Sequence, residues 1–114
     1  MEIKEKAHIL AETIAEKKGR DIIVIDISEK SSFADYFVNA TAGSDRQLGA
    51  LVDFVKDKAA ELDLTLKNSE GKAGGGWILV DLGDIVVNIF NSETREKYSL
   101  DKIWGDCNIE MIDD

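Results

Sequence analysis

Apolar residues recur with helical spacing near the N-terminus. One stripe, with spacings of four, three and four positions, consists of Ile3, Ala7, Leu10 and Ile14. This spacing is typical of an amphipathic helix, and Gly19 is expected to end it. His8 falls off the stripe, so we predict a solvated helix residue that serves neither as a ligand nor as a general base.

A second and longer apolar stripe follows in the middle of the chain. Its members, spaced by three, four, four and three positions, are Leu48, Leu51, Val55, Ala59 and Leu62. Ser44 and Gln47 stand just before it in the arrangement of a capping box, which closes the N-terminus of a helix. The pattern therefore predicts two long helices, each packing by its stripe.

Strand-like segments alternate with these helices. Residues 21–27, DIIVIDI, are β-branched and apolar on both faces apart from the acids, which predicts a central strand. Residues 36–42 predict a second strand that leads directly into the capping box. A short strand is expected at 64–67, followed by a mobile loop at 68–76 that contains four glycines.

The most informative segment is WILVDLGDIVVNIF, residues 77–90, whose two strand-like halves meet at Gly83 and Asp84 as a tight hairpin. If Leu82 pairs with Ile85, the period of two yields one wholly aliphatic face, which must be the core side. The other face is mixed and pairs Trp77 with Phe90, Leu79 with Asn88, and Asp81 with Val86. Because only two long helices are available, we expect this mixed face to stay partly open for a partner, or to be covered by the C-terminal segment.

The C-terminal quarter carries weaker patterns. Residues 92–106 place Tyr98 and Trp104 among charges and predict a short helical turn that ends near Gly105. Residues 107–114 end in acids and are expected to fray. The elements together predict an α/β protein, a mixed sheet of about five strands with two long helices, folded as a single domain over residues 1–114.

The charge balance limits the partners of this chain. Asp and Glu number 23 against 14 Lys and Arg, a formal charge of −9 that opposes a phosphate backbone, so direct nucleic-acid readout is not expected. Residues 81–114 hold nine acids and three bases, a net charge of −6, which suits either a basic protein surface or a solvated tail. With one cysteine, Cys107, and no apolar run near the roughly 20 residues of a membrane span, we expect a cytoplasmic location and no membrane contact.

Catalytic and metal-binding patterns are weak. One His and one Cys form no zinc site, and neither a metal nor another cofactor is expected. The run EGKAGGG, residues 70–76, lacks the Lys followed by Ser or Thr of a phosphate loop and precedes a strand.

The segment TAGSDRQ, residues 41–47, is similar to the phosphate-binding element of nucleotidyltransferases, because a strand leads to Gly-Ser at a helix N-terminus. Those enzymes also need two acids, separated by one residue, on one strand to hold metal ions. Asp21 and Asp26 are five positions apart, and Asp81 and Asp84 are three apart across a turn, so neither pair fits. A nucleotidyltransferase-like, nucleotide-binding enzyme remains the alternative function, although neither pair of acids has the spacing that its active site needs.

Four motifs in order, at residues 31–38 (SSFADYFV), 41–47, 75–90 and 95–106 (REKYSLDKIWGD), resemble the ribosomal silencing factor, or iojap-related, family along nearly the whole chain. The resemblance implies an α/β fold related to nucleotidyltransferases without their activity, often dimeric. It also implies binding to the large ribosomal subunit through its fourteenth ribosomal protein, where the family hinders joining of the small subunit and represses translation when nutrients are scarce. A non-enzymatic role is therefore expected.

The strand pattern suggests which residues meet such a partner. We expect the apolar anchors to be Trp77, Leu79 and Phe90. The acids expected to pair with Lys or Arg are Asp81 and Asp84, and the expected edge contacts are Tyr98 and Trp104. For both Tyr98 and Trp104 the competing role is core packing, and for Trp104 we favour core packing over partner contact. A third possibility for the open face is burial against a second copy of the chain.

Overall fold

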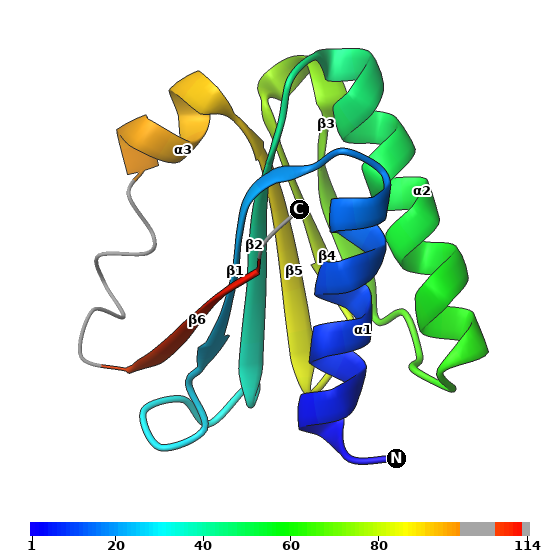
Figure 1. The fold of residues 1–114 in the computed structure, drawn as a ribbon, viewed down its shortest axis with the longest axis vertical. Helices are drawn as coiled ribbons and strands as arrows, with labels where there is room; N and C mark the ends of the chain where they lie inside the picture. Colours follow the sequence, from blue (N-terminus) through cyan, green and yellow to red (C-terminus); the bar gives the residue numbers. More distant parts are fainter. Residues whose placement is uncertain (99–106, 113–114) are drawn as a thin grey trace.

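The computed structural model describes residues 1–98 and 107–112, and its helices and strands form a mixed α/β fold (Figure 1). The elements are α1 (Ile3–Glu16), β1 (Arg20–Asp26), β2 (Tyr36–Ala42), α2 (Asp45–Glu61), β3 (Asn68–Lys72), the 3-10 turn η1 (Ala73–Gly75), β4 (Trp77–Asp81), β5 (Ile85–Asn91), α3 (Ser92–Tyr98) and β6 (Asn108–Ile112). Within the described residues the strands make one six-stranded sheet in the order β3-β4-β5-β2-β1-β6. Of the neighbouring strands in this described sheet, β2 and β5 pair in parallel and the others pair antiparallel. The predicted α/β class and mixed sheet are confirmed.

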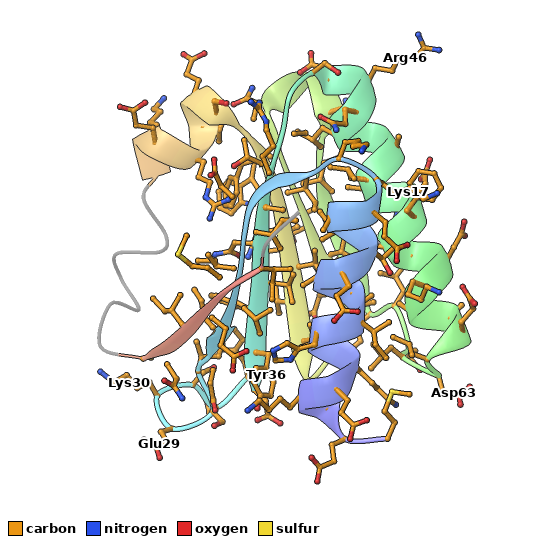
Figure 2. The ribbon with its side chains drawn as sticks, viewed as in Figure 1. Lys17, Glu29, Lys30, Tyr36, Arg46 and Asp63 are labelled. Carbon is orange, nitrogen blue, oxygen red and sulfur yellow. The ribbon has the colours of Figure 1, made fainter. Side chains whose placement is uncertain are left out.

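The two long helices lie side by side over one face of the sheet (Figure 1). Between them and the sheet is the larger apolar core, which contains the aliphatic hairpin face that the period of two predicts, Ile78, Val80, Leu82, Ile85, Val87 and Ile89, each at most 7% exposed. Figure 2 shows side chains filling this layer, while Arg46 and Asp63 extend outward at opposite ends of α2. The two long helices thus cover one face of the sheet, and neither of them covers the other face.

The predicted capping box forms in a modified way, because Ser44 caps α2 as expected while Gln47 bonds the N–H of Gly43, one residue before the cap. Ser44 Oγ accepts a hydrogen bond from Gln47 N at 3.0 Å. The side chain of Gln47 accepts from the Gly43 N–H, and its amide group donates to the Lys18 carbonyl oxygen at 3.0 Å. Because Lys18 lies just beyond α1, this one side chain joins the end of the first helix to the start of the second.

The strand predicted at 64–67 and the mobile loop predicted at 68–76 are both wrong. Residues 68–72 form β3, which pairs with β4 along its whole length, and residues 73–75 form η1. Every residue of β3 is exposed, so no apolar alternation marks it. The strand forms because β4 offers an unpaired backbone edge, and such pairing overrides the weak β-propensity of this polar segment.

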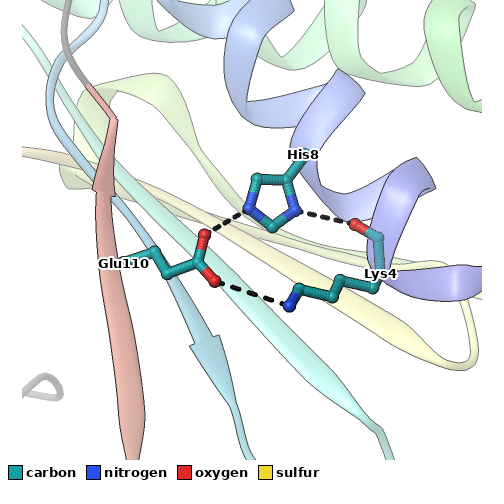
Figure 3. A network of polar contacts seen from close by, with 3 residues as sticks. All are labelled: Lys4, His8 and Glu110. Carbon is teal, nitrogen blue, oxygen red and sulfur yellow. Dashed lines mark hydrogen bonds and ion pairs between the residues drawn. The ribbon is translucent and has the colours of Figure 1, made fainter.

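The expectation that residues 107–114 fray is wrong for 108–112, because these residues form β6 on the outer edge of β1. A contact with α1 also fastens the strand (Figure 3). Glu110 Oε2 lies 2.5 Å from His8 Nε2, and Glu110 Oε1 lies 3.7 Å from Lys4 Nζ. The prediction that His8 is merely a solvated helix residue is therefore wrong, because its ring has a carboxylate partner 102 positions away.

The His8 ring faces an acceptor on each side. Its Nδ1 is 2.9 Å from the Lys4 carbonyl oxygen, and its Nε2 faces the Glu110 carboxylate. Only the doubly protonated ring can donate to both at once. Accordingly the pKa of His8 is raised by the bond to the Lys4 carbonyl and by Glu110, against a lowering by partial burial, while the bond from His8 lowers the pKa of Glu110.

Candidate partner-binding site

The face of the sheet opposite the two long helices carries the residues that the hairpin pattern singled out. The observed register pairs Trp77 with Phe90, Leu79 with Asn88, and Asp81 with Val86, as predicted. The turn bond from Leu82 N to the Ile85 carbonyl oxygen measures 2.9 Å, and Gly83 adopts a φ of +87°, which favours glycine there. A small apolar cluster occupies the neighbouring part of this face: Ile23, Ile25, Ile27, Ala34, Phe37 and Val86.

Trp77 is held in a defined position on this face. Its ring stacks on Phe90, with ring centroids 5.3 Å apart and an interplanar angle of 29°. Its Nε1–H donates to Asn88 Oδ1 at 3.1 Å. Trp77 itself is only partly buried, whereas Phe90 is 1% exposed. Phe90 therefore supports the Trp77 ring from the neighbouring strand β5, and Trp77 is the more exposed of the two.

A buried polar chain continues from Trp77 across the sheet. Asn88 Nδ2 donates to Asn39 Oδ1 at 3.0 Å, and these two residues are 1% and 0% exposed. The chain thus runs from β4 through β5 to β2. Sequence reasoning missed this role, although two asparagines inside apolar strands were a visible signal, because buried amides must find partners.

A groove lies beside Trp77 at the β3 edge. It has a volume of about 240 Å³ and is lined by Glu70, Gly71, Trp77 and Leu79. Leu79 is partly buried and contacts the small apolar cluster of this face, so the floor of the groove is continuous with packed side chains. Glu70 lies directly opposite Leu79 in the β3–β4 register. Neither Glu70 nor Gly71 was among the residues predicted to meet a partner.

The two predicted acids lie at the far end of the hairpin. Asp81 ends β4, four residues from Trp77, which corresponds to roughly 13 Å along a strand. Its Oδ1 accepts from Gly83 N at 2.9 Å, so this carboxylate also holds the turn. Asp84 is exposed at the turn itself. The structure thus brings Trp77, Leu79 and Phe90 together and keeps the acids separate from them.

The predicted edge contacts cannot be placed in the same way. Trp104 lies outside the described residues, and so does the side chain of Tyr98, whose backbone ends α3. The start of α3 is held close to the sheet, because Asn91 Oδ1 accepts from Thr94 N at 2.8 Å. Arg95 of α3 donates to Thr41 Oγ1 at 3.0 Å and to the Asp21 carbonyl oxygen.

The nucleotidyltransferase-like element at the start of α2 is occupied by the chain itself. The Gly43 N–H donates to the Gln47 side chain and the Gln47 N–H to Ser44, so these two amides already have acceptors. Among the residues that the structure describes, no group of three or more His, Cys, Asp or Glu side chains is placed to hold a metal ion. None of the described helices is both long and apolar enough to cross a membrane.

Comparison with known proteins gives consistent matches along the whole chain. Residues 1–114 match the model of a family described as "Ribosomal silencing factor during starvation". A ribosomal silencing factor of Bacillus subtilis is 37% identical over 113 residues, which cover 99% of this chain and 96% of that protein. The mouse protein named mitochondrial assembly of ribosomal large subunit protein 1 is 34% identical over 100 residues, 84% of this chain and 43% of the mouse protein. A crystal structure from Chromobacterium violaceum superposes with a TM-score of 0.87 at 37% identity and covers 92% of this chain and 88% of that one.

Proposed function

Because the chain belongs to the ribosomal silencing factor, or iojap-related, family, we propose that it binds the large ribosomal subunit through that subunit's fourteenth ribosomal protein. Bound there, it hinders joining of the small subunit and so represses translation when nutrients are limiting. The mechanism is steric occlusion in the cytoplasm, without an enzymatic step. The name of the mouse relative, which refers to the ribosomal large subunit, supports the choice of subunit.

The observation that carries the proposal is the presentation of Trp77. Its ring is supported by Phe90 and its indole N–H is already bonded to Asn88, so a partner meets a rigid aromatic surface. Partly exposed tryptophans of this kind are frequent centres of binding energy in interfaces. A side chain that is ordered before binding loses little entropy when the complex forms. Trp77 and Leu79 are therefore the proposed contacts, and Phe90 supports the Trp77 ring from the neighbouring strand.

Charge supports the same partner class. A formal charge of −9 favours a basic ribosomal protein over rRNA. Asp84 is exposed, and Asp81 is partly exposed, at the end of the hairpin, where they can pair with Lys or Arg. Tyr98 and Trp104 remain proposed edge contacts. An interface of standard size, about 800 Å² per partner, would extend over this whole sheet face.

The same face offers a surface to a second copy of the chain. A homodimer that buries Trp77 would compete with ribosome binding, because both would cover the same residues. Subunit occupancy is then expected to rise less steeply with protein concentration than it would for a monomeric protein, because the dimer holds part of the chain in a form that cannot bind.

The test is sedimentation of purified ribosomal subunits through sucrose in magnesium, with and without the protein. We expect the protein to migrate with the large subunit and the fraction of whole ribosomes to fall. Trp77→Ala should weaken this binding at least about 30-fold, which corresponds to about 2 kcal/mol. Phe54→Ala is the matched control, because it removes a 39% exposed aromatic side chain from α2, on the helical side of the molecule.

Two results would contradict the proposal. If the wild-type protein stays at the top of the gradient and subunit joining is unaffected, the assigned function fails. If binding occurs but Trp77→Ala behaves like Phe54→Ala, the protein binds ribosomes through a different surface.

A further inference from the structure

The groove beside Trp77 combines an apolar floor with one carboxylate. Its lining consists of Glu70, Gly71, Trp77 and Leu79, and it encloses about 240 Å³. Trp77 and Leu79 point to the same side of β4, two positions apart, so an indole and an isobutyl group form adjoining parts of the floor. Among the residues that the structure describes, Glu70 is the only charged one in the lining.

The backbone of β3 lies unusually close to β4 at Gly71, beside the groove. Gly71 has a φ of +97°, and a side chain there would overlap the Trp77 carbonyl oxygen. Only glycine is compatible with this combination of conformation and contact. The strand can therefore lie close to β4 while Glu70, the preceding residue, stands opposite Leu79.

The Glu70 carboxylate retains acceptor capacity. Its Oε1 accepts from Asn68 Nδ2 at 3.0 Å, which orients the group from one side. A carboxylate has about four lone-pair sites, so this bond leaves room for a donor from a partner. Lys72 lies opposite Trp77 in the register but does not line the groove.

We propose that this groove binds an arginine side chain of the partner protein, with Glu70 as its anion and Trp77 as its stacking surface. The inference rests on the proposed partner surface and names the chemistry recognised there. The aliphatic stem of an arginine suits Leu79, and its planar guanidinium can stack on an indole while it bonds a carboxylate. Lysine lacks the planar head, and an uncharged side chain leaves Glu70 without compensation as the interface closes.

The first experiment measures binding of variants to purified large subunits at about 0.1 M salt. Glu70→Gln keeps the shape and the acceptor for Asn68 but removes the charge, so we expect the dissociation constant to rise about tenfold. Glu12→Gln is the matched control, because it removes the same charge from an exposed position of α1, and less than a twofold change is expected. Lys72→Gln should tighten binding by about twofold, since it removes a cation near the site.

The second experiment probes the groove without ribosomes. N-acetylarginine amide and N-acetylcitrulline amide have nearly the same shape, but only the first is charged. With the indole N–H of Trp77 observed by NMR, we expect a saturating shift with the arginine compound, a much smaller one with citrulline, and loss of the difference in Glu70→Gln.

The outcomes separate the two proposals. If Trp77→Ala weakens subunit binding but Glu70→Gln matches Glu12→Gln, the arginine site is refuted while the proposed function stands. If wild-type protein does not bind the subunit, the proposed function fails, and the NMR comparison decides the groove by itself. Equal shifts with arginine and citrulline would overturn the arginine site in either case.

Discussion

The buried pair Asn39 and Asn88 offers the sharpest test of how the Trp77 surface is built. Replacing Asn39 by alanine removes the acceptor of a 3.0 Å bond at a site where both residues are at most 1% exposed. The Asn88 amide then has no partner at this position and no access to water. An unsatisfied buried donor costs about 1–3 kcal/mol, so we expect Asn39→Ala to lower the free energy of unfolding by about 2 kcal/mol.

A double-mutant cycle isolates the bond from the loss of packing. Asn88→Ala alone should cost a similar amount, because it leaves both Asn39 and the indole N–H of Trp77 without this partner. In the double variant the orphaned amide is gone, so the combined cost should be smaller than the sum of the single costs by about 1 kcal/mol. Urea unfolding followed by circular dichroism measures all three values.

Asn68→Ala is the control for the chemical change itself. Its amide bonds Glu70 at 3.0 Å in an exposed position, so its removal should change stability by less than about 0.5 kcal/mol. Additive costs for Asn39→Ala and Asn88→Ala would refute the reasoning, because they would mean that the two amides do not depend on each other. A further consequence is that Asn88→Ala should weaken partner binding, since the Trp77 ring would lose its orienting bond.

Two other predictions concern the edge strands. Gly71→Ala should lower the free energy of unfolding by about 1–3 kcal/mol, because φ is +97° and the new methyl group would meet the backbone of β4. Thermal unfolding checks this prediction, with Gly74→Ala as the control because nothing lies within 4 Å of a methyl group there. Equal unfolding midpoints for the two variants would contradict it. His8→Gln should abolish part of the pH dependence of stability: with the pKa of His8 raised above its ordinary value of 6.5, its contact with Glu110 stabilises the fold fully below that value and less as pH rises through the folded pKa. From about pH 6 to about pH 8, the urea midpoint of unfolding should therefore fall more in the wild type than in the variant. An equal fall in both proteins would rule the contact out as a source of stability.

The parts of the fold that could be predicted are those in which periodic side chains repeat a local rule. The stripe of α2 and its capping residues gave that helix within one residue of its observed end. The alternation in residues 77–90 gave the strand register, and with it the position of Trp77 beside Phe90. In both cases the pattern reports which side chains must leave water, and the geometry of a helix or hairpin then leaves little choice.

The site was only partly predictable for the same reason. Trp77 and Leu79 could be named because they are the large apolar side chains of β4 on the mixed face of the hairpin. Glu70 could not, because its segment looked like a glycine-rich loop until β4 provided a backbone edge to pair with. The roles of Asn39 and Asn88 depend on parallel pairing between β2 and β5, which brings together residues 49 positions apart.

By itself, the sequence determined the two helices, the central strands, the hairpin register and which hairpin residues share the mixed face of the sheet. The tertiary structure alone decided that polar residues 68–72 become an edge strand, that residues 108–112 become another, and that His8 finds Glu110 across 102 positions. The physical reason is that burial of apolar side chains leaves a periodic trace in the local sequence, whereas an edge strand is stabilised by backbone hydrogen bonds to a neighbour. Those bonds are available to almost any residue except proline, so the residues that make them carry little record of it.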